Sequence, residues 1–89
     1  MKTLHEILDS IVIESAESLH FDTFIDEIEK QMPGYEIEYW DSDDYTTPIE
    51  LTDSVAYYVL ENKDATDLQA GIWATDIGDT YLYIVAVKK

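Results

Sequence analysis

The hydrophobic pattern of this chain changes period once, at Pro33-Gly34, and this change constrains the fold more than any other feature of the sequence. Before the pair, apolar residues recur at the spacing of an amphipathic helix; after it, they alternate as in a strand. The pair itself separates the two because proline cannot continue a helix and glycine accepts a positive φ. We therefore expect an α+β domain in which two N-terminal helices pack on one face of an antiparallel β-sheet of four to five strands.

The first helix is predicted to begin at Thr3-Leu4-His5-Glu6, a T-x-x-E capping box. Leu4, Ile7, Leu8 and Ile11 follow on one helical face. The end of this helix stays open, because Ile11-Val12-Ile13 is β-branched and suits either a last turn or extended chain. Residues 14–19 are therefore either helical or a linking segment.

The second helix is predicted to take Asp22 or Thr23 as its N-cap. Phe24, Ile25 and Ile28 supply its apolar stripe, and the helix ends at Pro33-Gly34.

Four strands are expected after this point, over residues 35–40, 54–61, 70–75 and 80–87. Residues 41–48 form a polar loop between the first two, and Pro48 argues against a central strand there. A hairpin turn is expected at residues 76–79. The chain contains no linker and no internal repeat, so residues 1–89 form a single acidic domain.

The net charge of −15 comes from 20 Asp and Glu against five Lys, with no Arg. A domain of this size usually has a net charge of magnitude ~2–8, because a larger charge destabilises the compact state by repulsion. Since 46% of the residues are hydrophobic, the chain still has the composition of a folded protein. Three explanations remain open: a salt-adapted protein, a solvated surface without a partner, and a surface that competes for a basic groove.

Binding of nucleic acid by the chain is excluded by the near absence of cations, because phosphate contacts require Lys and Arg. Catalysis has little support: His5 lies in the capping box, and His20 lies far from it in sequence. Asp41-x-Asp43 resembles the start of a calcium loop but lacks the later glycine and glutamate of that motif. We expect no enzyme activity, no cofactor and no metal.

The spacing of the carboxylates is more informative. Glu36 and Glu38 alternate along one predicted strand, which places them ~6.6 Å apart on one face. Successive phosphates of a nucleic-acid strand recur every ~3.4 Å of helix axis, so the two carboxylates span about two phosphate steps. Carboxylates held this way can occupy a phosphate-binding groove, although the same two residues also suit a plain solvated sheet face.

Three motifs resemble the Ugi-type uracil-DNA glycosylase inhibitors of bacteriophages, which are small acidic DNA mimics. The start Leu4-His5-Glu6-Ile7-Leu8-Asp9 is similar to the first helix of that family. Ile11-Val12-Ile13 followed by Glu17-Ser18-Leu19 resembles its apolar stretch and Glu-Ser contact pair. Ile25-Asp26-Glu27-Ile28, ending at Pro33, resembles its acidic second helix. The chain departs from the pattern at Phe24, near which the family has an acidic residue, and Glu14-Ser15 is a rival for the contact pair.

The resemblance implies roles for eight residues. Glu17 and Ser18 would meet the DNA-contacting loops of the enzyme, and Glu27 would replace a phosphate. An apolar pocket between the second helix and the sheet would take the protruding leucine of the enzyme. Its lining would be Phe21, Ile25 and Ile28, completed on the sheet side by Ile37 and Val59, which are placed by alternation alone. These apolar residues at helical spacing also suit an ordinary core.

The function expected from these observations is stoichiometric inhibition of uracil-DNA glycosylase by DNA mimicry. We expect a cytoplasmic monomer, in the host cytoplasm if a phage encodes it, that forms a 1:1 complex with the glycosylase or another DNA-binding enzyme with a basic groove. One alternative is a DNA mimic directed at another defence enzyme, as anti-restriction and anti-CRISPR proteins are. A second is an immunity protein or antitoxin that neutralises a basic nuclease.

Overall fold

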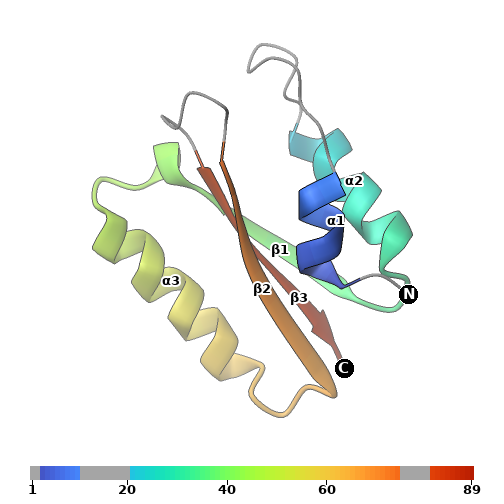
Figure 1. The fold of residues 1–89 in the computed structure, drawn as a ribbon. Coiled ribbons are helices and arrows are strands. Elements are labelled where there is room, and N and C mark those ends of the chain that lie inside the picture. The colour runs from blue at the N-terminus through green and yellow to red at the C-terminus, as the bar shows by residue number, and fades with distance from the viewer. Residues whose placement is uncertain (1–2, 11–20, 75–80) are drawn as a thin grey trace.

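A three-stranded antiparallel sheet lies between two helical layers (Figure 1). The structure, a computed structural model, describes residues 3–10, 21–74 and 81–89. Helices α1 (Leu4–Ser10) and α2 (Phe21–Gln31) cover one face of the sheet. Helix α3 (Pro48–Glu61) covers the other face. The predicted α+β class is confirmed. The prediction of four to five strands with helices on one face only is not confirmed, because the described residues contain three strands and helices cover both faces of the sheet.

Strand β3 (Tyr81–Lys88) lies at the centre of the sheet, between β1 (Glu36–Asp41) and β2 (Asp67–Ala74). Ile84 of β3 is opposite Tyr39 on one side and Gly71 on the other. Residues 84–87 are all buried, since both faces of this strand are covered. Three of the predicted strands, 35–40, 70–75 and 80–87, correspond to β1, β2 and β3, while the hairpin predicted at 76–79 lies outside the described residues.

The prediction of a strand over residues 54–61 is wrong, because these residues belong to α3. The start of this helix explains the outcome. Thr47 is its N-cap and accepts a hydrogen bond from the backbone N–H of Glu50 (3.2 Å), while the Glu50 carboxylate accepts one from the N–H of Thr46 (3.3 Å). Pro48 occupies the first turn, where its fixed φ favours a helix. Pro48 therefore begins a helix rather than sitting in a polar loop.

The two N-terminal helices were predicted more accurately than α3, because short sequence motifs mark where they begin or end. Thr3 Oγ1 accepts a hydrogen bond from the backbone N–H of Glu6 (3.2 Å), as the capping box predicts. Helix α2 ends at Gln31, and Gly34 then takes a φ of 88°. Asp22 and Thr23 lie within α2 and not before it, so the predicted N-cap is wrong. Residues 14–19, for which the sequence leaves helix and linking segment open, lie outside the described residues.

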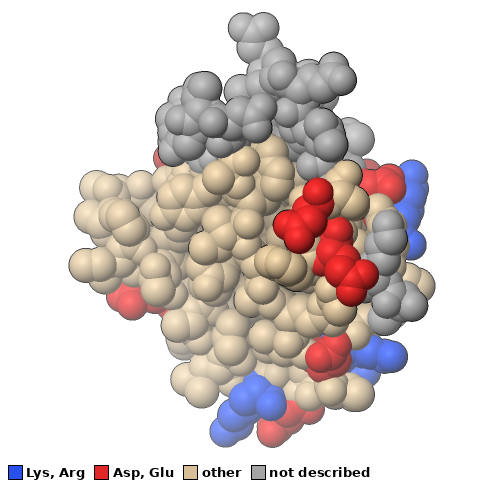
Figure 2. Space-filling view, in the orientation of Figure 1, with Lys and Arg blue, Asp and Glu red and all other residues tan. Residues whose placement is uncertain are grey.

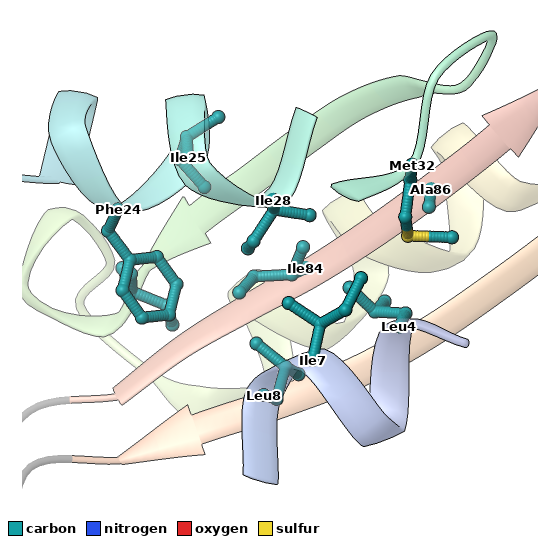
Figure 3. Packing of buried hydrophobic residues seen from close by; sticks show 10 residues of the cluster. Leu4, Ile7, Leu8, Phe24, Ile25, Ile28, Met32, Ile84 and Ala86 are labelled. Carbon is teal, nitrogen blue, oxygen red and sulfur yellow. The ribbon is translucent and has the colours of Figure 1, made fainter. Parts of the chain in front are cut away.

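The larger hydrophobic core lies between α1, α2 and the sheet (Figure 3). Ile7 and Ile28 are fully buried, and both side chains point toward Ile84 of β3. Ten buried residues share this cluster: Leu4, Ile7, Leu8, Phe24, Ile25, Ile28, Met32, Leu82, Ile84 and Ala86. This face of the sheet is closed, and it holds α1 and α2 in place.

The smaller core lies under α3. Leu51 and Val55 are its buried helical residues, and they pack with Val85 and Val87 of β3. Partly buried aromatic side chains surround this cluster, among them Trp40 and Tyr58, whose ring centroids are 5.3 Å apart at an interplanar angle of 65°. The second face is therefore covered along its middle and is more open at its flanks.

Candidate partner-binding surface

The residues that the sequence predicted for the partner site do not all come together. Glu17 and Ser18 lie outside the described residues, as does the rival pair Glu14-Ser15. Phe21 is the first residue of α2. The enzyme-facing role of Glu17 and Ser18 therefore stays a prediction.

Three of the predicted pocket residues, Ile25, Ile28 and Ile37, do join one cluster, but this cluster is the core of the protein itself. Ile28 is fully buried and Ile25 nearly so, which leaves their side chains packed against the sheet. Val59 is a residue of α3 and packs against the smaller core on the opposite face of the sheet. Its placement on a strand beside Ile37 was wrong for the reason given above: residues 54–61 are helical.

Glu27 is exposed on the outer face of α2 and accepts a hydrogen bond from the side-chain amide of Gln31 (3.1 Å). Asp26 and Glu29 are exposed beside it, together with Lys30. This helix therefore presents three carboxylates and one ammonium group to solvent.

Most carboxylates of the described residues are exposed. Thirteen of the fifteen whose side chains are described belong to the exposed class, and Asp41 and Asp67 are half-buried. Two ion pairs are found in the described part of the chain: His5 with Asp9 at 3.5 Å and Lys89 with Glu36 at 3.3 Å. Both pairs lie at the surface, where such contacts contribute little to stability. The acidic side chains are therefore available to a partner.

One group of carboxylates gathers between β1 and α3, and we name Glu36, Glu38 and Glu61 the acidic edge. Glu36 and Glu38 lie on the same strand face as Trp40, which packs under α3. Glu61 ends that helix. Burial raises the pKa of the nearby Tyr58 hydroxyl, and the negative charges of all three carboxylates raise it further. The three carboxylates therefore lie near the Tyr58 hydroxyl.

A groove of about 570 Å³ lies on the other flank of α3, toward β2, and we name it the α3–β2 groove. Its lining is mostly apolar: Thr52, Val55, Ala56, Val59, Leu60, Asn62, Lys63, Leu68 and Tyr83. In Figure 2 the surface over α3 and β2 is largely free of charged side chains, while red atoms gather over α1. Helix α3 thus separates an acidic flank from an apolar flank.

The other shifted groups belong to a network that joins the ends of β1 and β2. The Tyr35 hydroxyl donates a hydrogen bond to the Asp67 carboxylate, and the Gln69 amide donates a second (2.9 Å). These donors hold the pKa of Asp67 below its usual value, and the carboxylate raises the pKa of Tyr35. Gln69 Oε1 also accepts from the backbone N–H of Leu4 (2.7 Å). The network fastens α1 to the sheet, which accounts for the shifts without a catalytic role.

Within the described ranges, no three His, Cys, Asp or Glu side chains are grouped so that they could hold a metal ion. In the same ranges, no helix has the length and apolar character needed to cross a membrane.

The residues that sequence reasoning missed are Tyr58 and Glu61, since it treated this segment as a strand. Thr47-Pro48-Ile49-Glu50 is a capping box with proline at the first helical position, and it could have revealed α3. Comparison of the chain with models of known protein families, with characterised proteins and with solved structures found no match.

Proposed function

We propose that this protein is a DNA mimic that inhibits a DNA-binding enzyme, with uracil-DNA glycosylase as its first candidate target. The observation that carries the proposal is the acidic edge, where Glu36, Glu38 and Glu61 are exposed on regular secondary structure around Tyr58. The choice of glycosylase rests on the resemblance of the N-terminal motifs to the Ugi-type inhibitors.

The geometry of the acidic edge supports recognition of a phosphate-binding groove. Glu36 and Glu38 are two residues apart on β1, so their Cα atoms are ~6.6 Å apart along the strand. A strand and a helix hold these carboxylates, so a partner does not have to order the backbone that carries them. The net charge of −15 also favours fast encounter with a basic surface.

The leucine-burying half of the expected mechanism is not supported at its predicted place. Ile25 and Ile28 are packed in the core of the protein, and Val59 lies on the opposite face of the sheet. The proposal therefore depends on the carboxylates. It also shifts the main contact from α2, where the resemblance puts Glu27, to the acidic edge.

The proposal is tested by titrating a bacterial uracil-DNA glycosylase with the protein while excision of uracil from DNA is measured. Activity should fall linearly and vanish near one equivalent. Two triple variants then locate the contact: Glu36→Gln/Glu38→Gln/Glu61→Gln at the acidic edge, and Asp26→Asn/Glu27→Gln/Glu29→Gln on α2 as the matched control. Both remove three exposed charges, but we expect only the first to weaken inhibition, by about ten-fold or more.

Two results would contradict the proposal at different levels. If only the α2 variant lost inhibition, the acidic edge would be the wrong surface and the resemblance the better guide. Full enzyme activity at a large excess of protein in moderate salt would exclude the glycosylase as the target. The same titration would then be repeated with a restriction enzyme, a CRISPR nuclease and a basic toxin nuclease, which are the alternatives that the charge leaves open.

A further inference from the structure

Lys89, which directly follows β3, lies against the acidic edge. Its Nζ is 3.3 Å from Glu36 Oε2. The Lys89 side chain also lines a small pocket together with Glu61 and Asp64, at the end of α3. Lys89 therefore lies between the two elements that carry the acidic edge, β1 and α3, and brings a positive charge to this surface.

The sheet sets this position of Lys89. Val87 of β3 is buried on the face under α3, and Lys88 turns to the other face, where its Nζ is 5.9 Å from the centre of the Tyr35 ring. The Lys88 carbonyl accepts a hydrogen bond from the backbone N–H of Thr66 (2.7 Å), which fixes the backbone up to this residue. Because side chains alternate along a strand, Lys89 returns to the face of α3. Its ammonium group thus stays near the acidic edge even when the ion pair is open.

The ion pair itself is held weakly. The side chains of Lys89 and Glu36 are 66% and 62% exposed, and such a pair contributes little to stability because water screens both charges. An entering cation can displace Lys89 without leaving a buried charge unpaired, which is the main cost of breaking a buried pair. The contact between Lys89 and Glu36 is therefore exchangeable.

We propose that Lys89 is an internal competitor for the acidic edge, and that a lysine or arginine side chain of the partner displaces it from Glu36 on binding. This rests on the proposed function, in which the acidic edge is the surface that the partner contacts. A tethered ammonium group acts as a ligand at high local concentration. Lys89 therefore lowers the affinity of every partner that must reach Glu36.

The competitor makes the acidic edge selective. A partner that offers one isolated cation replaces one exposed ion pair by another of the same kind, and so gains little. A basic groove that offers several cations pairs with Glu38 and Glu61 at the same time and keeps the gain from those contacts. We therefore expect the acidic edge to prefer an extended basic surface, such as the groove of a DNA-binding enzyme, over a surface with scattered lysines.

Two simpler roles of Lys89 have to be separated from competition. Any lysine of the chain weakens attraction to a basic partner through its long-range charge, an effect that is screened over ~8 Å at physiological ionic strength. Lys30 is the matched control for this role, because it is exposed on α2, which covers the opposite face of the sheet. The other role is stabilisation of the fold, which would leave the affinity of the folded protein unchanged.

The test is a titration of isotope-labelled protein with hexalysine, a short basic peptide, at physiological ionic strength. The backbone amides of β1 and of the end of α3 are followed by NMR. We expect Lys89→Ala to lower the dissociation constant at these amides by about two- to five-fold, the factor that loss of one exposed ion pair predicts. Lys30→Ala removes the same charge and should change the constant by less than about 1.5-fold. Lys89→Arg keeps the competing charge and should bind as the wild type does.

A double-mutant cycle tests the pair directly. In a Glu36→Gln background Lys89 has lost its partner, so Lys89→Ala should no longer tighten binding. An equal gain with and without the Glu36 carboxylate would show that Lys89 acts only through its long-range charge, against the proposal. Circular dichroism checks that each variant is folded.

Unchanged affinity in Lys89→Ala would overturn the proposal, as would equal tightening by Lys89→Ala and Lys30→Ala. If hexalysine shifted no amide of the acidic edge in any variant, the surface itself would be wrong, and the proposed function would fail with it. No enzyme takes part in these titrations. A result against the glycosylase as the target therefore leaves the role of Lys89 standing.

Discussion

The two faces of the sheet are built differently. The face under α1 and α2 is closed, with Ile7, Ile28 and Ile84 fully buried at its centre. The face under α3 has a smaller core, and its flanks expose carboxylates on one side and apolar side chains on the other. Burial of apolar area is the main source of stability, so we assign the stability of the fold chiefly to the first face and contact with partners to the second.

The largest expected difference in the free energy of unfolding is between substitution of a buried residue on the closed face and substitution of an exposed residue on the open face. Ile28→Ala should lower the free energy of unfolding by about 2–5 kcal/mol, because it leaves a cavity among packed side chains. Leu60→Ala should change it by less than ~0.5 kcal/mol, since this side chain is exposed in the monomer. Urea denaturation in dilute protein measures both. Equal losses would show that α3 carries as much of the core as α2.

A second comparison uses neighbouring residues on β2. A Cβ atom at Gly71 would lie 2.8 Å from Cδ1 of Leu8 in α1. Gly71→Ala should therefore lower the free energy of unfolding by about 1 kcal/mol. This is the low end of the range for overpacking, because the Leu8 side chain can rotate away. Ala70→Val adds two methyl groups on the open face and should stay within ~0.5 kcal/mol of the wild type. Urea denaturation measures the free energy of unfolding of both variants. Leu8→Ala should remove the penalty of Gly71→Ala, and failure to do so would contradict the proposed clash.

The start of α3 supplies a third test. Thr47→Ala removes the acceptor for the backbone N–H of Glu50 and should cost about 1 kcal/mol. Thr47→Ser keeps the hydroxyl and should recover most of that loss. Thermal unfolding followed by circular dichroism compares the three proteins. An unchanged melting temperature in Thr47→Ala would show that packing of Leu51 and Val55 alone fixes this helix.

The smallest effect concerns pH. The pKa of Asp67 is lowered by its donors Tyr35 and Gln69, so its contribution to stability is complete above the unfolded value of 3.8 and is lost as pH falls through the folded value. The pKa of Tyr35 is raised, so its contribution is lost as pH climbs through a value above 10.0. We expect Asp67→Asn to be less stable than the wild type near neutral pH, with a difference that shrinks below pH 3.8. A difference independent of pH would contradict the network.

The sequence predicted the α+β class, α1, α2 and the three strands because their signals are local: the Thr3 capping box, Pro33-Gly34 and the alternation after Tyr35. It failed at α3, where Val and Tyr favour a strand by propensity while the capping box at Thr47 and the packing of Leu51 and Val55 favour a helix. The candidate site followed the same division. Glu36 and Glu38 were recognised from their spacing, but their grouping with Glu61 and the groove beyond it depend on α3, and both were missed because this segment was interpreted as a strand.

The central claim is that the face under α3 meets the partner while the face under α1 and α2 holds the fold. Backbone amide shifts of isotope-labelled protein, recorded by NMR as unlabelled uracil-DNA glycosylase is added, test it most directly. We predict changes concentrated in β1 and at the C-terminal end of α3, around Glu36, Glu38 and Glu61, with little change on the outer face of α2. Changes confined to α2 around Glu27, with none in β1 or α3, would contradict the account.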